Sequence, residues 1–229
     1  MFTRYDPFLR EKIWTELWEV DRLEEFPVYF LAFLDVALWD IQSKALGVPT
    51  YKLLGGHKSR ARAYASTVTF DLLDDYLRAI DRCPESGYRA VKLHVWGRVS
   101  DDIKLVRAVR KHVGSEIELM LEGSAGYSLD EAVLLGRALE DAGYLWLEEP
   151  IREPPDQLEL QGWIHRSPKR GSSGGVVPLQ SDVHGGDHAS LALVCALPNS
   201  QYFESMFPDE CFPDATMGSP MIRPNSLKW

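Results

Sequence analysis

The chain has 229 residues, of which 45% are hydrophobic and 26% are charged, and its formal net charge is −9 at pH 7. This length can bury the core of one large domain, or of a barrel with a small partner domain. The acidic balance argues against a nucleic acid partner, because phosphate binding needs a basic face. A small anionic substrate is still compatible, since a metal ion and local lysines can reverse the field inside a site.

Cysteine usage and hydropathy indicate the cellular compartment. The three cysteines, Cys83, Cys195 and Cys211, are scattered and odd in number, which favours reduced thiols over a disulfide framework or a metal cluster. No apolar run reaches the ~18 residues that a membrane span needs. The first residues lack the apolar segment of a signal peptide. We therefore expect a cytoplasmic protein with no membrane partner.

Two helices are predicted before the first clear strand, over residues 7–25 and 28–46. The second is rich in large apolar residues and is stopped by the glycine and proline at 47–49. The candidates for the buried face of the first helix are Phe8, Ile13, Leu17 and Trp18. Residues 1–56 are thus expected to form a small helical cap.

Strands and helices then alternate as far as residue 150. The predicted strands cover 60–69, 88–95, 117–121 and 145–147, and the predicted helices cover 72–82, 101–113 and 128–142. Pro84 and Gly87 are expected to close the first of these helices, and Ser128 with Glu131 forms a capping box that opens the last. Strand–helix–strand units of this length predict a parallel sheet, and so an α/β fold.

The alternation fails after residue 150. A stretch rich in proline, glycine, serine and basic residues follows, most densely at 167–175, and a structureless loop this long counts against a complete regular fold. Beyond it we expect a strand near 176–178, a helix over 187–197 and a short strand over 201–204. The tail from 207 is expected to be irregular.

Polar side chains recur at the ends of the predicted strands. Lys92 and His94 end one strand, Glu122 follows His94 by 28 residues, and Glu148 follows Glu122 by 26. Lys92 and His94 are two apart, so both face one side of their strand. The C-terminal ends of parallel strands are where active sites form in α/β folds. A site at this edge is predicted.

Each of these residues also has a plain structural interpretation. Lys92 and His94 could be solvated groups at a strand end, and Glu122 and Glu148 could be surface acids or helix caps. His184 lies in a glycine-rich turn, where a histidine is commonly solvated, and His188 is an alternative one turn later. Spacing alone leaves both interpretations open.

Several longer motifs resemble one family. The runs Ala37-Leu38-Trp39-Asp40-Ile41, Lys44 to Pro49 and Leu53-Leu54-Gly55-Gly56 resemble the cap-to-barrel junction of the mandelate racemase/muconate lactonizing branch of the enolase superfamily. Lys92-Leu93-His94, Glu122-Gly123-Ser124 and Glu148-Glu149-Pro150 follow in the order of that family's base motif and its two metal motifs. His184 and Glu204, 20 residues apart, are similar to its catalytic histidine and its glutamate on the last strand.

The resemblance implies a fold and a reaction. The fold would be an incomplete (β/α) barrel with the remnant of an α+β cap. Its parts would be 1–56 as cap remnant, 57–206 as barrel domain with an internal deletion near 154–176, and 207–229 as a C-terminal tail that is irregular or returns to the cap. The reaction would be Mg²⁺-dependent abstraction of the proton α to a carboxylate through an enediolate. Dehydration of an acid sugar (aldonate or aldarate) is favoured over racemisation, by analogy alone.

The resemblance also assigns roles. Glu122 and Glu148 would hold the Mg²⁺, because hard cations prefer carboxylate oxygen. His94 would be the base, since its ordinary pKa lies near working pH, and Lys92 would pair with the substrate carboxylate. His184 would act from the opposite face as acid or second base. Two further residues complete the set: Glu204 would hydrogen-bond the enediolate oxygen, and Ser124 would contact the substrate.

Departures from the family pattern leave rival interpretations open. Glu122 and Ser124 stand where the family has Asp and Asn. Only 36 residues separate Glu148 from His184, so the third metal ligand and the aspartate that partners the histidine are expected to be missing; Asp182 is a spare acid without support from spacing. The cap's first strands are also expected to be absent. A catalytically inactive truncated homologue and a small-acid binding module are the alternatives, and open sheet edges predict marginal stability and a homo-oligomer.

Overall fold

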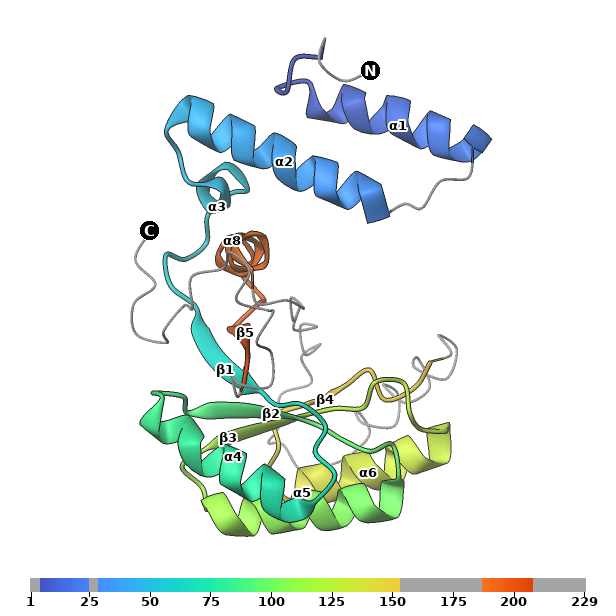
Figure 1. Cartoon of the computed structure of the whole chain (residues 1–229), viewed down its shortest axis with the longest axis vertical. Coiled ribbons are helices and arrows are strands. Elements are labelled where there is room, and N and C mark those ends of the chain that lie inside the picture. The colour runs from blue at the N-terminus through green and yellow to red at the C-terminus, as the bar shows by residue number, and fades with distance from the viewer. Residues whose placement is uncertain (1–4, 25–28, 153–186, 208–229) are drawn as a thin grey trace, which may run out of the picture.

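The computed structural model describes residues 5–24, 29–152 and 187–207 (Figure 1). Its helices are α1 (Arg10–Glu24), α2 (Tyr29–Leu46), α3 (Thr50–Leu53), α4 (Leu73–Glu85), α5 (Val99–Val113), α6 (Leu129–Asp141) and α8 (His188–Ala196). Its strands are β1 (Arg62–Ser66), β2 (Ala90–His94), β3 (Glu118–Glu122), β4 (Leu147–Glu148) and β5 (Tyr202–Met206). The predicted alternation of strands and helices between residues 60 and 150 is confirmed.

The strands form one parallel sheet in the order β4-β3-β2-β1-β5. The last described strand in the chain therefore lies beside the first, and all the strand ends that carry polar residues share one edge. Figure 1 shows α4, α5 and α6 together against one face of the sheet, with the α1–α2 pair at the opposite end of the molecule. The predicted α/β class is confirmed.

Side chains alternate between two environments along each strand, as the pleat requires. One face packs on the helices in the main core, which includes Ala65, Val91, Leu121 and Phe203. The other face carries a second, smaller cluster with Tyr64, Met120, Tyr202 and the partly buried Trp146. Both faces of the sheet are thus lined by apolar groups below the polar strand ends.

Three local predictions need correction. Ile13 and Leu17 are buried, whereas Trp18 is 56% exposed because α2 covers a narrower stripe of α1 than predicted. Phe8 is 49% exposed and lies before α1, which begins at Arg10. Pro84 lies inside the last turn of α4 and does not end the helix. The short helix α3 was not predicted. The expected strand near 176–178 and the tail beyond 207 lie outside the described residues.

The start of α6 follows its sequence signal closely. Ser128 and Glu131 form both hydrogen bonds of the capping box, which satisfies amide groups that have no partner within the helix. None of the helices in the described ranges combines the length and apolar character that crossing a bilayer requires.

One arginine ties together the ends of two helices on the far side from the polar strand ends. The Arg110 guanidinium donates to the carbonyls of Gly114, Ile117, Ala142 and Gly143 at 2.7–3.0 Å. It also lies over the Tyr144 ring, 5.6 Å from the centroid. A planar group with five donors can serve four carbonyls at once, which a lysine ammonium cannot.

We therefore expect Arg110→Lys to lower the free energy of unfolding by about 2 kcal/mol, because most of these carbonyls lose their charged donor. Urea unfolding followed by circular dichroism measures this. Arg107→Lys, an exposed change on the same helix, is the control and should stay within about 0.5 kcal/mol of the parent chain. Equal losses in both variants would contradict this account of Arg110.

Candidate active site

Four charged side chains meet at the C-terminal edge of the sheet. Lys92, Glu122 and Glu148 come from β2, β3 and β4, and Glu204 comes from β5. The strand register places Glu122 opposite both His94 and Glu148. The convergence of the two glutamates beside His94, predicted from sequence, is thus present in the structure.

Lys92 is the centre of this cluster. Its Nζ lies 3.0 Å from Glu148 Oε2, 3.1 Å from Glu204 Oε1 and 3.8 Å from Glu122 Oε2, and its side chain is fully buried. Burial alone would lower the pKa of Lys92, but the charges of Glu204 and Glu148 outweigh burial and raise that pKa above its usual value. The ammonium therefore stays charged and holds the three carboxylates together. Its predicted pairing with a substrate carboxylate stays a prediction.

The pKa of the Glu122 carboxyl group is raised above its usual value. Burial raises its pKa to about 7; the Ser124 amide, which donates to Oε1 at 2.6 Å, opposes that rise, the charge of Glu148 adds to it, and Lys92 opposes it. Carboxyl groups with pKa values near neutrality are typical of functional sites, although buried ion-pair networks produce them too. Glu122 can thus exchange a proton near pH 7.

The cluster has more carboxylates than cations. One ammonium faces three glutamates; Lys92, Glu122 and Glu204 are buried, and Glu148 is partly exposed. In the described ranges no set of three or more His, Cys, Asp or Glu side chains is arranged to hold a metal ion. Two neighbouring carboxylates are nevertheless chemically suited to a hard divalent cation, which prefers oxygen and keeps several waters. Glu122 and Glu148 therefore fit Mg²⁺ by donor chemistry and by the surplus of negative charge.

His94 lies at the end of β2 with its ring partly enclosed. Its Nδ1 is buried and has no hydrogen-bond partner among the described residues. Burial, together with the positive charge of Lys92, lowers the pKa of His94 below the usual value despite the opposing effect of Glu204. The imidazole is thus neutral at pH 7, which is the form a general base needs.

Glu204 is enclosed more completely than the other carboxylates. It is 1% exposed, and its Oε1 accepts a hydrogen bond from Ser66 Oγ at 2.7 Å in addition to the Lys92 contact. Whether this carboxyl group contacts a substrate stays a prediction. The structure shows it as the partner of Lys92 from the most distant strand in the chain.

Three residues that touch the cluster were missed from the sequence: Tyr64, Ser66 and Trp146. The Tyr64 ring centroid lies 5.1 Å from Lys92 Nζ, and Trp146 Nε1 donates to Glu148 Oε2 at 3.3 Å. A signal for them exists, because Tyr64 and Ser66 share one face of β1 and Trp146 precedes Glu148 by two residues. Residues two positions before a polar strand end point to the same face of the sheet, and applying this to each strand would have found them.

The loops after β3 and β4 are joined by their backbones. The Ala125 amide donates to Glu149 O at 2.6 Å, and Ser124, Ala125 and Glu149 all have positive φ angles, between 38° and 57°. A side chain on Gly123 would place its Cβ 2.8 Å from Pro150 Cα, so only glycine fits there. Strained backbone of this kind often accompanies functional sites.

Some residues named from the sequence are not seen in the cluster. His184 lies outside the described residues, as does Asp182. Ser124 contributes its backbone amide to Glu122, and its predicted contact with a substrate stays a prediction. His188, the alternative to His184, is the first residue of α8.

Comparisons with known proteins support the family. Residues 75–169 match the family model described as enolase C-terminal domain-like. The chain is 34% identical over 164 residues to D-galactarolactone cycloisomerase of Agrobacterium fabrum (strain C58), covering 67% of this chain and 42% of that protein. It is 32% identical over 164 residues to L-talarate/galactarate dehydratase of Salmonella typhimurium (strain LT2), covering 69% and 40%.

A solved structure gives the same assignment at the level of the fold. D-glucarate dehydratase from Agrobacterium tumefaciens, complexed with magnesium, superposes with a TM-score of 0.74 at 28% identity, over 88% of this chain and 67% of that one. The predicted fold, part of a (β/α) barrel of the enolase-superfamily type, is thereby confirmed. The chain spans less than half the length of the two curated relatives described above. Residues 75–169 thus carry the enolase C-terminal domain-like family match, and over part of its length the chain resembles enzymes of the mandelate racemase/muconate lactonizing branch of the enolase superfamily.

Proposed function

We propose that this protein removes the proton α to the carboxylate of a small hydroxy acid in a Mg²⁺-dependent reaction, and that the substrate is an acid sugar that loses water. The observation that carries the proposal is the buried cluster of Lys92 with three glutamates beside a neutral His94. A weakly acidic C–H bond breaks only if the developing negative charge is met as it forms. The cluster brings positive charge and a candidate base together at the C-terminal edge of the sheet.

The residues divide the work as follows. Neutral His94 takes the α proton, and the electron pair of the broken C–H bond passes into the substrate carboxylate to give an enediolate. Lys92 stabilises the added charge, and Glu204 would hydrogen-bond the enediolate oxygen when it carries a proton. Glu122 and Glu148 would hold Mg²⁺, which when bound supplies further positive charge beside the carboxylate.

The second half of the reaction concerns the β hydroxyl group. In dehydration the enediolate electrons form a carbon–carbon double bond as the C–O bond breaks, and the leaving hydroxide takes a proton to become water. We propose His184 as the donor of that proton and Ser124 as a substrate contact. The support is by analogy: the relatives include L-talarate/galactarate dehydratase and the magnesium complex of D-glucarate dehydratase.

One observation favours a second candidate function. The described residues contain no set of three or more metal-binding side chains, so a module that binds a small acid through Lys92 without turnover is the competing proposal. The two proposals differ in their need for a divalent ion. A metal titration therefore separates them.

For the catalytic proposal, Mg²⁺ at about 100 times its Kd should raise Tm by roughly 5–10 °C, because a ligand that binds only the folded state stabilises it. Glu148→Gln should lose most of that rise in differential scanning fluorimetry. Glu118→Gln is the matched control, because it removes a carboxylate at the other end of the same sheet, where Glu118 pairs with Arg62. No rise in the parent chain would support the binding module.

Replacing the proposed base should abolish chemistry. His94→Asn should reduce kcat on the best substrate from a panel of aldonic and aldaric acids by about 10²–10⁴-fold, the usual contribution of a general base. Product formation can be followed by detection of the 2-keto acid. His112→Asn, which disturbs only a surface pair with Asp81, should keep the parent rate. Equal rates in both variants would exclude His94 as the base.

The pH dependence of kcat/KM should reflect the same group. The base must be neutral to accept a proton, and burial with Lys92 lowers the pKa of His94. The acidic limb of the profile should therefore lie below the usual histidine value of about 6.5. Initial rates between pH 4.5 and 8, measured at saturating Mg²⁺ so that Glu122 stays ionised, test this. An acidic limb above pH 7 would point to a different base.

A further inference from the structure

The backbone around His94 is held by side chains that do not belong to the ionic cluster. Tyr76, on α4, is fully buried, and its hydroxyl donates to His94 O at 2.5 Å. Its ring packs edge-on against Phe70 and Trp96, with centroids 5.1 and 5.6 Å away. The His94 amide donates to Thr67 Oγ1 at 3.3 Å. Both backbone groups of His94 are thus fixed.

The segment that follows His94 is held by a buried carboxylate. Asp102, in the first turn of α5, is fully buried and accepts hydrogen bonds from the amides of Trp96 at 3.1 Å and Arg98 at 2.6 Å. Its third donor is the Tyr127 hydroxyl at 2.8 Å. A carboxylate with three donors fixes both the start of α5 and the loop after β2.

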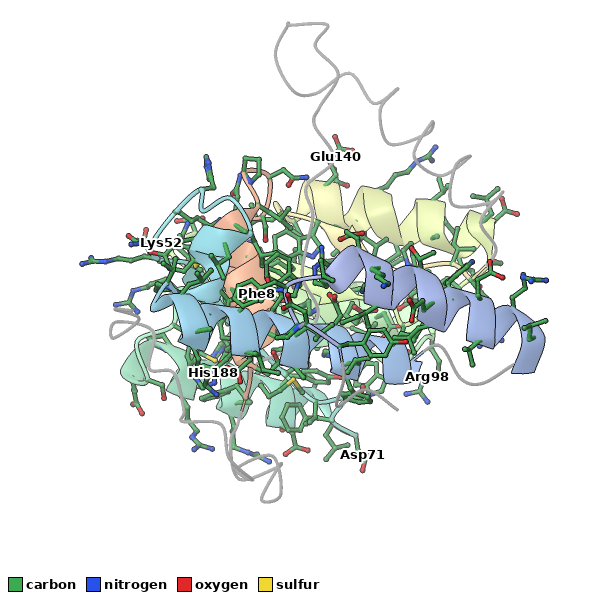
Figure 2. All side chains as sticks on the ribbon, turned by 90° about the horizontal axis from the view of Figure 1, so that it is seen from above. Phe8, Lys52, Asp71, Arg98, Glu140 and His188 are labelled. Atoms are coloured by element: carbon green, nitrogen blue, oxygen red, sulfur yellow. The ribbon has the colours of Figure 1, made fainter. Side chains whose placement is uncertain are left out.

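The same contacts connect three neighbouring loops. Trp96 Nε1 donates to Phe70 O at 2.6 Å, which ties the loop after β2 to the loop after β1, and Tyr127 follows β3. The exposed ends of these loops differ from their buried parts: Asp71 and Arg98 lie at the periphery of the molecule in Figure 2. The buried hydrogen bonds therefore form a frame behind His94, separate from the cluster in front of it.

The His94 ring depends on this frame more than an ordinary catalytic histidine would. Its buried Nδ1 has no hydrogen-bond partner in the described part of the chain, so no neighbouring described side chain orients the imidazole through that atom. The direction of the ring then follows from the position of its backbone, from packing and from the neighbouring Thr67 backbone. A shift of the His94 backbone would move the ring with it.

We propose that Tyr76 and Asp102 are positioning residues for His94, with Tyr127 acting through Asp102. Their importance for catalysis rests on the proposed function, whereas the positioning of the ring can be measured without turnover. Neither residue touches the ionic cluster in the hydrogen bonds described above. Their effect should therefore be selective for the geometry of His94.

The test compares Tyr76→Phe and Asp102→Asn with Tyr144→Phe in the 229-residue chain. Tyr144 is the matched control because its buried hydroxyl also donates to a backbone carbonyl, that of Val106, at 3.1 Å. Histidine rings are labelled with ¹³C and ¹⁵N, and the His94 signals are assigned by their loss in His94→Asn. Tyr76→Phe and Asp102→Asn should shift or split the His94 ring signals, whereas Tyr144→Phe should lower Tm and leave them in place.

Kinetics add a second readout. If an acid sugar is turned over, Tyr76→Phe should lower kcat by roughly 10–100-fold with KM within about twofold, because a misplaced base costs rate more than binding. His94 ring signals that coincide with those of the parent chain in both variants would overturn the proposal. A parent chain without turnover would refute the proposed function but not the positioning, which the ring signals decide. Tyr76→Phe conserves shape, so it remains informative if Asp102→Asn fails to fold.

Discussion

The site depends on the burial of one ammonium group among three carboxylates. Lys92 is fully enclosed, and its partners come from three different strands. Removing one partner from such a cluster leaves uncompensated buried charge, which is far more costly than the net value of the pairing itself. The relative positions of β2, β3, β4 and β5 are therefore tied to an electrostatic requirement as well as to their ladder of backbone hydrogen bonds.

Two sets of contacts support this centre from different sides. Beneath it, the rings of Tyr64 and Trp146 pack edge to face with their centroids 6.0 Å apart. The charged groups therefore lie against an apolar layer. Behind this centre, the hydrogen bonds of Tyr76 and Asp102 fix the backbone at the His94 carbonyl and at the Trp96 amide that follows. The apolar layer strengthens each charge interaction in the cluster, and the frame determines where the base lies relative to them.

Much of the fold and the site was predictable because short strands obey a simple period of two. That period placed Lys92 and His94 on one face, and the regular strand spacing brought Glu122 and Glu148 to the same edge. The pattern could not show that β5 pairs with β1, because strand order depends on long-range packing. The family resemblance assigned Lys92 to a substrate carboxylate, which stays a prediction, and gave no sign of its three glutamate partners. The exposure of Trp18 was missed because a helix's periodicity does not say how wide a stripe its neighbour covers, and that of Phe8 because the helix begins only at Arg10.

The position of β5 has a consequence for when the Lys92–glutamate cluster can form during folding. Glu204 lies more than a hundred residues after Lys92 in the sequence, so β1 to β4 leave the ribosome well before the last carboxylate exists. Until β5 docks beside β1, Lys92 lacks the most enclosed of its three partners. Pairing between strands so far apart in sequence slows folding, and the ionic centre is complete only when β5 docks beside β1.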